Sequence, residues 1–350
     1  MTNDWRTPIV QPYTGRRTPA FLHGVIAPMF TPCHPDHTLD EAGIRSWTDY
    51  LVGTGAVTTL FPRCGLGRMY AFAYDEVKRI IDVVIDQAAD RVPVMPGTMG
   101  VWGRDPARRP DPAAFTRQSI ELSQYAEKKG ATAVVLVLPA ALPPQEGVPL
   151  EETIFAYFRA VASEISLPIV MYQPPGLPEE YGMTPSLLRR LLSVRTIAGM
   201  KYSTGNMVAF TRLAMVAEDA DFAFIAGDEA AFFFAITLGA TAVIGQGCDI
   251  NPETLRAVYD RMMAQDIVGA REAHYDSIRA LEAAEGIDCV IAGLTYAARK
   301  GAKVQPYTKV AGSPYRAPAD RTIPQDRMDT FEAVIDTLRA RYPRPAKITA

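Results

Sequence analysis

Short apolar runs alternate with longer amphipathic stretches along most of the chain. The runs are apolar at nearly every position, which is typical of strands buried on both faces of a sheet, while the longer stretches repeat their apolar positions at helical spacing. We predict strands over residues 24–29, 56–61, 92–96, 133–138, 168–172, 197–201, 222–226 and 241–245. We predict helices between and after them over residues 41–52, 74–89, 113–129, 151–165, 184–192, 207–217, 229–238 and 252–265.

Helix start signals and the regular alternation together predict the fold. Asp40, Asp111, Thr184 and Asn251 each stand at the start of a predicted helix, where their side chains can accept hydrogen bonds from its first backbone amides. Eight strands that alternate with helices favour a parallel sheet closed into a (β/α)8 TIM barrel, which is an α/β fold. An open, doubly wound sheet is the alternative, although no Gly-x-Gly-x-x-Gly follows the first strand.

The pattern also divides the chain into three parts. Residues 1–22 contain several prolines and predict an extended N-terminal arm. Residues 23–265 form the predicted catalytic barrel. Residues 266–350 predict a C-terminal helical appendage packed on the barrel, with helices over 267–284, 288–300 and 325–341 and a proline-rich stretch over 312–318.

Composition makes several classes of protein unlikely matches for this chain. The 350 residues are 48% hydrophobic and carry a net charge of −3 with no basic stripe, so nucleic acid is not an expected partner. The N-terminus lacks the apolar core of a signal peptide and no apolar run is long enough to cross a bilayer, which favours a cytoplasmic protein without membrane contact. The four cysteines and four histidines show no metal-ligand spacing, so we expect no metal.

Lys201 is the first candidate for chemistry, because a short apolar strand ends on it and a loop of small residues follows. An ammonium group at the end of a buried strand loses hydration and its pKa falls, so that a neutral amine can attack a ketone and form a Schiff base. The alternative is a lysine that leaves the edge of the sheet and extends to water.

Tyr172 is the second candidate, because it ends the strand before that of Lys201. A barrel places its catalytic residues at the C-terminal ends of the strands. An amine and a phenol on adjacent strands can reach one small ligand, so Tyr172 could move protons to and from a carbinolamine formed by the lysine. A core aromatic residue whose hydroxyl caps a loop is the alternative for Tyr172.

These two positions, with several motifs in the same order, resemble the dihydrodipicolinate synthase and N-acetylneuraminate lyase superfamily of Schiff-base aldolases. The resemblance covers about residues 23–310 and rests on residues 24–32 with Leu39-Asp40, 92–98, 172–176, 199–205, 226–228 and 239–245. It implies that Lys201 forms an imine with pyruvate or another 2-oxo acid, that Tyr172 transfers protons, and that Gly227 and Ile244 help to line the pocket. It also implies a homotetramer or homodimer and no metal or organic cofactor.

The chain departs from the family in three places. Residues 64–68 read Cys-Gly-Leu-Gly-Arg where the family has Gly-Thr-Thr-Gly-Glu, so both hydroxyls that hold the keto-acid carboxylate are missing, although backbone amides could still bind it. Residues 139–141 read Pro-Ala-Ala in place of Pro-Tyr-Tyr, and Leu177 replaces an arginine that binds the carboxylate of the aldehyde substrate. Burying that carboxylate without paired donors is costly, so we expect negligible condensation of pyruvate with aspartate semialdehyde.

Side chains near this loop are further candidates. Arg63 and Arg68 could bind the substrate anion, or they could lie in water as ordinary loop arginines. Cys64 could be a reactive thiolate, although a small packing residue is the commoner use, and Asp228 and Asp249 could be acids or bases, or loop caps. The predicted substrate-binding residues are Arg63, Gly65, Leu66, Gly67, Arg68, Gly227 and Ile244, with Lys201 and Tyr172 as the catalytic pair.

Three hypotheses about function follow. The first is a Schiff-base carbon–carbon or carbon–oxygen lyase, an aldolase or hydro-lyase that acts on pyruvate or another 2-oxo acid through Lys201. The second is a dihydrodipicolinate synthase proper with a rebuilt proton relay, and the third is a non-catalytic homologue that binds keto acids. Because the lysine is present and the residues for the aldehyde substrate are not, the sequence favours the first.

Overall fold

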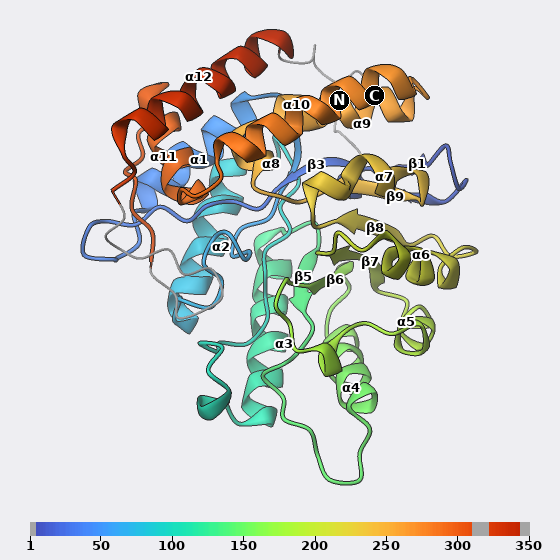
Figure 1. Cartoon of the computed structure of the whole chain (residues 1–350). Coiled ribbons are helices and arrows are strands. Elements are labelled where there is room, and N and C mark those ends of the chain that lie inside the picture. Colours follow the sequence, from blue (N-terminus) through green and yellow to red (C-terminus); the bar gives the residue numbers. More distant parts are fainter. Residues whose placement is uncertain (1–4, 310–321, 344–350) are drawn as a thin grey trace.

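The structure is a computed structural model that describes residues 5–309 and 322–343. Seven parallel strands lie in the order β4-β3-β9-β8-β7-β6-β5, with helices packed around them (Figure 1). These strands are β3 Gly24–Ala27, β4 Val57–Leu60, β5 Val134–Val137, β6 Ile169–Gln173, β7 Ile197–Tyr202, β8 Ala223–Ala226 and β9 Ala240–Val243. Each coincides closely with a predicted strand, and the predicted α/β barrel fold is confirmed.

The eighth predicted strand, residues 92–96, is not a regular strand, and its two prolines explain why. Proline has no backbone amide, so the segment cannot form a continuous ladder. Its other groups still bond to both neighbouring strands: the Met95 amide donates to the Leu60 carbonyl at 2.9 Å, and the Pro96 carbonyl accepts from the Val135 amide at 2.9 Å. The segment therefore fills the eighth place, between β4 and β5, and closes the barrel.

The helices of the barrel follow the predicted pattern closely. They are α1 Glu41–Gly53, α2 Tyr74–Ala88, α3 Pro112–Lys129, α4 Leu150–Ala162, α5 Pro185–Leu191, α6 Met207–Val216, α7 Phe232–Thr237 and α9 Pro252–Met263. The side chains of Asp40, Asp111 and Thr184 each accept a hydrogen bond from the amide three residues further on, as the start signals predict. The side chain of Asn251 makes no such bond to the first amides of α9. The short helix α8 Gly247–Ile250 was not predicted, and neither were the 3-10 turns η1 Ala20–Leu22, η2 Pro106–Arg108 and η3 Glu179–Tyr181. The predicted helix 229–238 begins as a 3-10 turn, η4 Glu229–Ala231, and continues as α7.

The N-terminal segment is a hairpin, so the prediction of an extended arm is wrong for its described part. Strand β1 Pro8–Val10 pairs antiparallel with β2 Arg17–Pro19. Two side chains fasten the hairpin to the barrel: Gln11 Nε2 donates to the Ile236 carbonyl at 2.7 Å, and Arg16 Nη2 donates to the Leu238 carbonyl at 3.0 Å. The hairpin is therefore bound to the C-terminal end of α7.

The three helices that follow α9 lie together on one side of the barrel strands (Figure 1). They are α10 Ile267–Ala283, α11 Cys289–Arg299 and α12 Gln325–Arg341. The Tyr342 hydroxyl donates to Asp276 Oδ2 at 2.6 Å and so ties the end of α12 to α10. This confirms the C-terminal helical part. The proline-rich stretch 312–318 lies outside the described residues, and the domain boundary at residue 265 stays a prediction.

Candidate active site

Lys201 and Tyr172 lie side by side at the C-terminal ends of two neighbouring strands. Tyr172 on β6 is the register partner of Lys201 on β7. The Lys201 Nζ lies 4.3 Å from the centre of the Tyr172 ring and 5.8 Å from the centre of the Phe61 ring. The Phe61 ring meets the Tyr172 ring edge-on, with the two centres 6.2 Å apart. The fold thus brings the predicted catalytic pair together and surrounds the amine with aromatic rings.

Burial changes the acid–base behaviour of Lys201. Only 5% of the residue is exposed, and this burial lowers the pKa of its amine to about 8. Nearby thiol and carboxyl groups oppose the shift but do not cancel it. With this pKa, about one amine in ten is neutral at pH 7. Within residues 5–309 and 322–343, no group forms a hydrogen bond to Nζ, so the neutral amine is available for attack on a carbonyl carbon.

The glycine loop after β4 is packed around the sulfur of Cys64. This Sγ donates to the Pro28 carbonyl at 2.8 Å and accepts from the Gly67 amide at 3.1 Å, with Gly65 and Leu66 forming the turn between them. Burial raises the pKa of the thiol to about 12, so Cys64 is a neutral packing group and not a thiolate nucleophile. A substrate carboxylate would have to compete with the sulfur for the Gly67 amide.

Arg63 and Arg68 both bind groups of the protein itself. The buried Arg63 guanidinium donates to backbone carbonyls of residues 97–100, including that of Gly97 at 3.3 Å. The Arg68 Nη2 lies 3.1 Å from Asp288 Oδ2 in an ion pair whose two side chains are 4% and 7% exposed. These contacts fasten the loop after β4 to its neighbours, and they argue against the predicted role of either arginine in anion recognition.

Gly227 and Ile244 lie where the sequence places them, just beyond β8 and β9. The Gly227 amide donates to the Tyr202 carbonyl at 2.9 Å, and the Ile244 amide donates to the Ala226 carbonyl at 2.9 Å. A Cβ added to Gly227 would lie 2.3 Å from the Ser203 Oγ, so this close approach of two strand ends requires glycine. Contact of Gly227 and Ile244 with a substrate stays a prediction.

The structure makes two buried carboxyl groups near the Lys201 amine stronger candidates for a role in the site. Glu229 was not among the predicted site residues, yet its Oε2 accepts from the Gly247 amide at 2.8 Å and burial raises its pKa to about 7. Asp249 is fully buried within α8, and burial raises its pKa well above the ordinary value. Both carboxyl groups interact electrostatically with Lys201. Asp228, in contrast, caps η4 with its side chain, which is the alternative role, that of a loop cap, predicted from the sequence.

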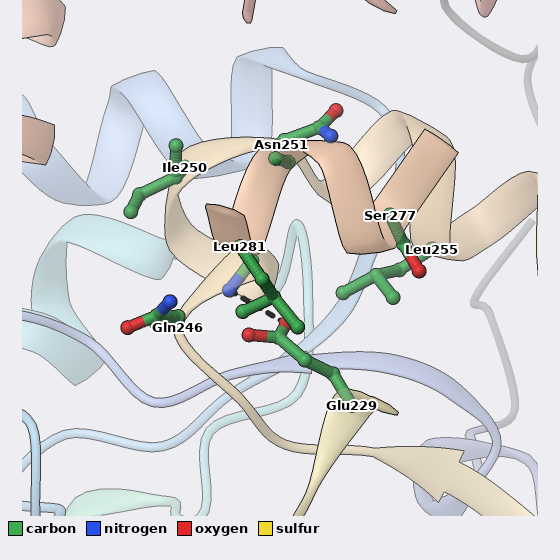
Figure 2. Close-up of a pocket in the computed structure, with 9 residues that line it drawn as sticks. Glu229, Gln246, Ile250, Asn251, Leu255, Ser277 and Leu281 are labelled. Atoms are coloured by element: carbon green, nitrogen blue, oxygen red, sulfur yellow. Dashed lines mark hydrogen bonds between the residues drawn. The ribbon is translucent and has the colours of Figure 1, made fainter. Parts of the chain in front are cut away.

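A small cavity lies beside Glu229, between the ends of the last strands and helices α8, α9 and α10 (Figure 2). Its lining consists of Glu229, Gln246, Gly247, Ile250, Asn251, Leu255, Ser277, Ala280 and Leu281. Its volume of about 10 Å³ has room for about one water molecule. The cavity is therefore too small for a keto acid. Glu229 was not predicted as a site residue because only the fold shows that its carboxyl group is buried.

Solved structures show the fold to which this barrel belongs. N-acetylneuraminate lyase from Mycoplasma synoviae superposes with a TM-score of 0.72 at 17% identity, over 92% of this chain and 99% of that one. YagE from E. coli K12, solved in complex with pyruvate, superposes with a TM-score of 0.73 at 23% identity, over 91% and 98%. At these identities the likeness shows the fold alone.

Comparison of sequences identifies the family of this chain. Residues 21–306 match the dihydrodipicolinate synthetase family. A 4-hydroxy-tetrahydrodipicolinate synthase from Archaeoglobus fulgidus is 30% identical over 254 residues, which are 73% of this chain and 80% of the relative. The corresponding enzyme of Pelobacter propionicus is 31% identical over 252 residues, which are 72% and 79%. The chain belongs to the dihydrodipicolinate synthetase family, and it is thereby a member of a superfamily of lyases.

Metal and membrane features are absent from the part of the chain that the structure describes. There, no group of three or more His, Cys, Asp or Glu side chains could hold a metal ion. No helix of the same residues combines the length and the apolar character needed to span a membrane. Catalysis without a cofactor and a cytoplasmic location both stay predictions.

Proposed function

We propose that the chain is a Schiff-base lyase, an aldolase or hydro-lyase, that acts on pyruvate or another 2-oxo acid through Lys201. The observation that carries this proposal is the buried amine, of pKa about 8, whose Nζ lies 4.3 Å from the centre of the Tyr172 ring on the adjacent strand. A lysine that merely extended from the sheet edge to water would be exposed, and Lys201 is buried.

The chemistry follows from a neutral amine beside a phenol. The amine attacks the keto carbon, the keto oxygen takes a proton, and a carbinolamine forms. Loss of that oxygen as water leaves a protonated imine, which withdraws electrons from the neighbouring carbon and lets that carbon lose a proton or a substituent. Tyr172 is the group that we assign to proton transfer in these steps. Addition of water then releases the product and restores Lys201.

Borohydride trapping tests the proposal directly. The protein is reduced in the presence of pyruvate and of a set of longer 2-oxo acids, and the adduct is located by mass spectrometry. We expect one adduct, on Lys201, and none in Lys201→Ala. The exposed Lys128 on α3 provides a matched control, because Lys128→Ala should trap as well as the wild type. An adduct on another lysine, or undiminished trapping in Lys201→Ala, would refute the mechanism.

A second candidate is dihydrodipicolinate synthesis proper, which the names of the curated relatives favour. Against it stand Leu177, which packs partly buried against the core and offers no donor to a carboxylate, and the small residues Ala140 and Ala141. A steady-state assay with pyruvate and aspartate semialdehyde separates the two candidates. We expect negligible turnover, and a catalytic efficiency above about 10⁴ M⁻¹s⁻¹ would assign the second function.

We also propose that the chain forms a homodimer or homotetramer. Large apolar side chains are exposed on neighbouring surface helices, including Val208 and Met215 on α6 and Phe234 on α7. Such exposed apolar groups are typical of a surface that another subunit covers. Light scattering should give a mass above that of the monomer, and Met215→Asp should lower it. A monomer at micromolar concentration would contradict this proposal.

A further inference from the structure

We propose that the buried ion pair of Arg68 and Asp288 positions the loop 64–67 for binding of the keto acid. Arg68 directly follows this loop, and Asp288 stands at the start of helix α11 in the C-terminal helical part. Both are positioning residues in this proposal, and neither contacts the substrate. The inference rests on the proposed function, since it concerns how the keto acid is held while Lys201 attacks it.

The loop 64–67 borders the reactive amine. The centre of the Phe61 ring, three residues before the loop, lies 5.8 Å from the Lys201 Nζ. The Cys64 thiol, in the loop itself, interacts electrostatically with the same amine. Gly65 is buried, and its amide donates to no acceptor among the described residues. Backbone amides of such a turn can bind an anion, so the Gly65 amide suits the carboxylate next to the carbon that Lys201 attacks.

The backbone of this loop needs support from outside. Arg63 and Arg68, which flank the loop, have φ values of 54° and 61°, a region that is costly for residues with a side chain. Within the turn, the Arg68 amide donates to the Gly65 carbonyl at 3.1 Å, and the Met69 amide donates to the Cys64 carbonyl at 3.0 Å. Such a strained backbone persists where the surrounding structure holds it, and the contacts of the two guanidinium groups provide that support.

One carboxylate holds both the loop and a helix. The Arg68 Nη2 lies 3.1 Å from Oδ2 and 3.5 Å from Oδ1 of Asp288. The same Oδ1 accepts from the Val290 amide at 2.9 Å and from the Ile291 amide at 3.3 Å, so Asp288 also caps α11. The two charged side chains are almost fully buried, and a buried charge-assisted contact is short and directional. The pair therefore fixes the end of the loop relative to α11.

Helix α11 is itself firmly held. A Cβ added to Gly293 would lie 2.6 Å from the Phe30 ring, so the helix packs closely against the chain beyond β3. The Tyr296 hydroxyl donates to Asp336 at 2.7 Å and ties α11 to α12. Loss of the ion pair should thus displace the loop and its Gly65 amide, while Lys201 on β7 keeps its place. We expect weaker binding of the keto-acid carboxylate and unchanged chemistry of the amine.

Two ligands that differ in the carboxylate test this inference. Pyruvate carries the charge, and methyl pyruvate has the same keto carbon without it. Borohydride trapping at graded concentrations gives the concentration of each compound that yields half of the maximal adduct on Lys201. Asp288→Asn removes the charge and keeps a residue that can cap α11. It should raise the value for pyruvate by about 10-fold, as for one hydrogen bond to a charged group, and leave that for methyl pyruvate nearly unchanged.

A second variant and a matched control exclude a general loss of stability. Arg68→Met/Asp288→Asn removes both charges, so that neither is left buried without its partner, and it should show the same rise for pyruvate. The control is Glu332→Gln on α12, whose carboxylate pairs with Arg299 at 2.6 Å and with Lys300 at 3.0 Å. This change also removes one negative charge that holds α11 in place, yet it leaves the loop untouched and should change neither value. Denaturant unfolding identifies the proteins that are folded under the assay conditions.

The outcomes separate this inference from the proposed function. If the folded double variant traps pyruvate and methyl pyruvate at the wild-type ratio, the positioning role is refuted and the Schiff-base function stands. An equal loss for both compounds, or an equal effect of Glu332→Gln, also refutes it, because the pair would then serve stability alone. If the wild type traps no 2-oxo acid, the proposed function fails. In that case calorimetric binding of pyruvate and methyl pyruvate to the same proteins still decides whether the pair supports carboxylate binding.

Discussion

Replacing Lys201 by methionine should abolish imine formation and at the same time stabilise the protein. Methionine has a similar length and no charge, so Lys201→Met removes the ammonium group and keeps most of the packing. The wild-type amine is buried, and burial lowers its pKa from 10.5 to about 8. An active site of this kind is expected to cost stability, because its reactive group is held in an environment that disfavours the charged form.

The size and the pH dependence of the gain follow from that pKa. A fall from 10.5 to about 8 corresponds to about 3 kcal/mol. Below pH 8 the amine is protonated in the folded and in the unfolded chain, so the full cost opposes folding. Between pH 8 and 10.5 the unfolded chain keeps a proton that the folded chain has lost, and stability therefore rises with pH. The advantage of Lys201→Met should thus be largest at pH 7 and should disappear by about pH 10.5.

Denaturant unfolding of both proteins at pH 7 and at pH 10, at one protein concentration, measures this difference. Lys128→Met on the surface of α3 is the control and should change little at either pH. The burial argument would fail if Lys201→Met were no more stable than the wild type at pH 7. It would fail equally if the gain were the same at both pH values, because the stabilisation would then come from packing and not from the charge.

Four further outcomes are expected. Tyr172→Phe should slow turnover by about 10²- to 10⁴-fold while pyruvate is still trapped, and turnover near the wild-type rate would assign proton transfer to another group. Burial lowers the pKa of His23 to about 4. Acidification from about pH 6.5 to 4 should therefore destabilise the fold, because only the unfolded chain binds the proton in that range. An unchanged pH dependence of stability in His23→Gln would contradict this. Asp288→Ala leaves Arg68 buried without its carboxylate and should cost about 3–5 kcal/mol, against less than about 1 kcal/mol for Asp86→Ala in an exposed pair, as judged by denaturant unfolding. Treatment with a metal chelator should leave the turnover of 2-oxo acids unchanged, and loss of activity that an added metal restores would overturn the expected absence of a cofactor.

The barrel could be predicted from the sequence because its strands are apolar on both faces and its helices carry clear start signals. The N-terminal hairpin could not, because its strands are only three residues long and local pattern says little about them. What holds the hairpin is a pair of contacts to distant backbone, such as that of Gln11 with Ile236, 225 residues further along the chain. The segment 92–96 shows the reverse case: its apolar pattern predicts its place in the barrel, while its prolines prevent a regular strand.

The site residues divide in the same way, according to whether their role depends on position along a strand or on partners elsewhere. Lys201 and Tyr172 end adjacent strands, and parallel pairing alone brings them together. A sequence also shows that Arg63, Arg68 and Arg104 follow strands, but it cannot show which of their donors the fold has already satisfied. Arg63 and Arg104 each donate to backbone carbonyls, while Arg68 binds the carboxylate of Asp288. The number of arginines near a barrel mouth is therefore a poor guide to anion binding, because the fold uses their donors in ways that the sequence does not show.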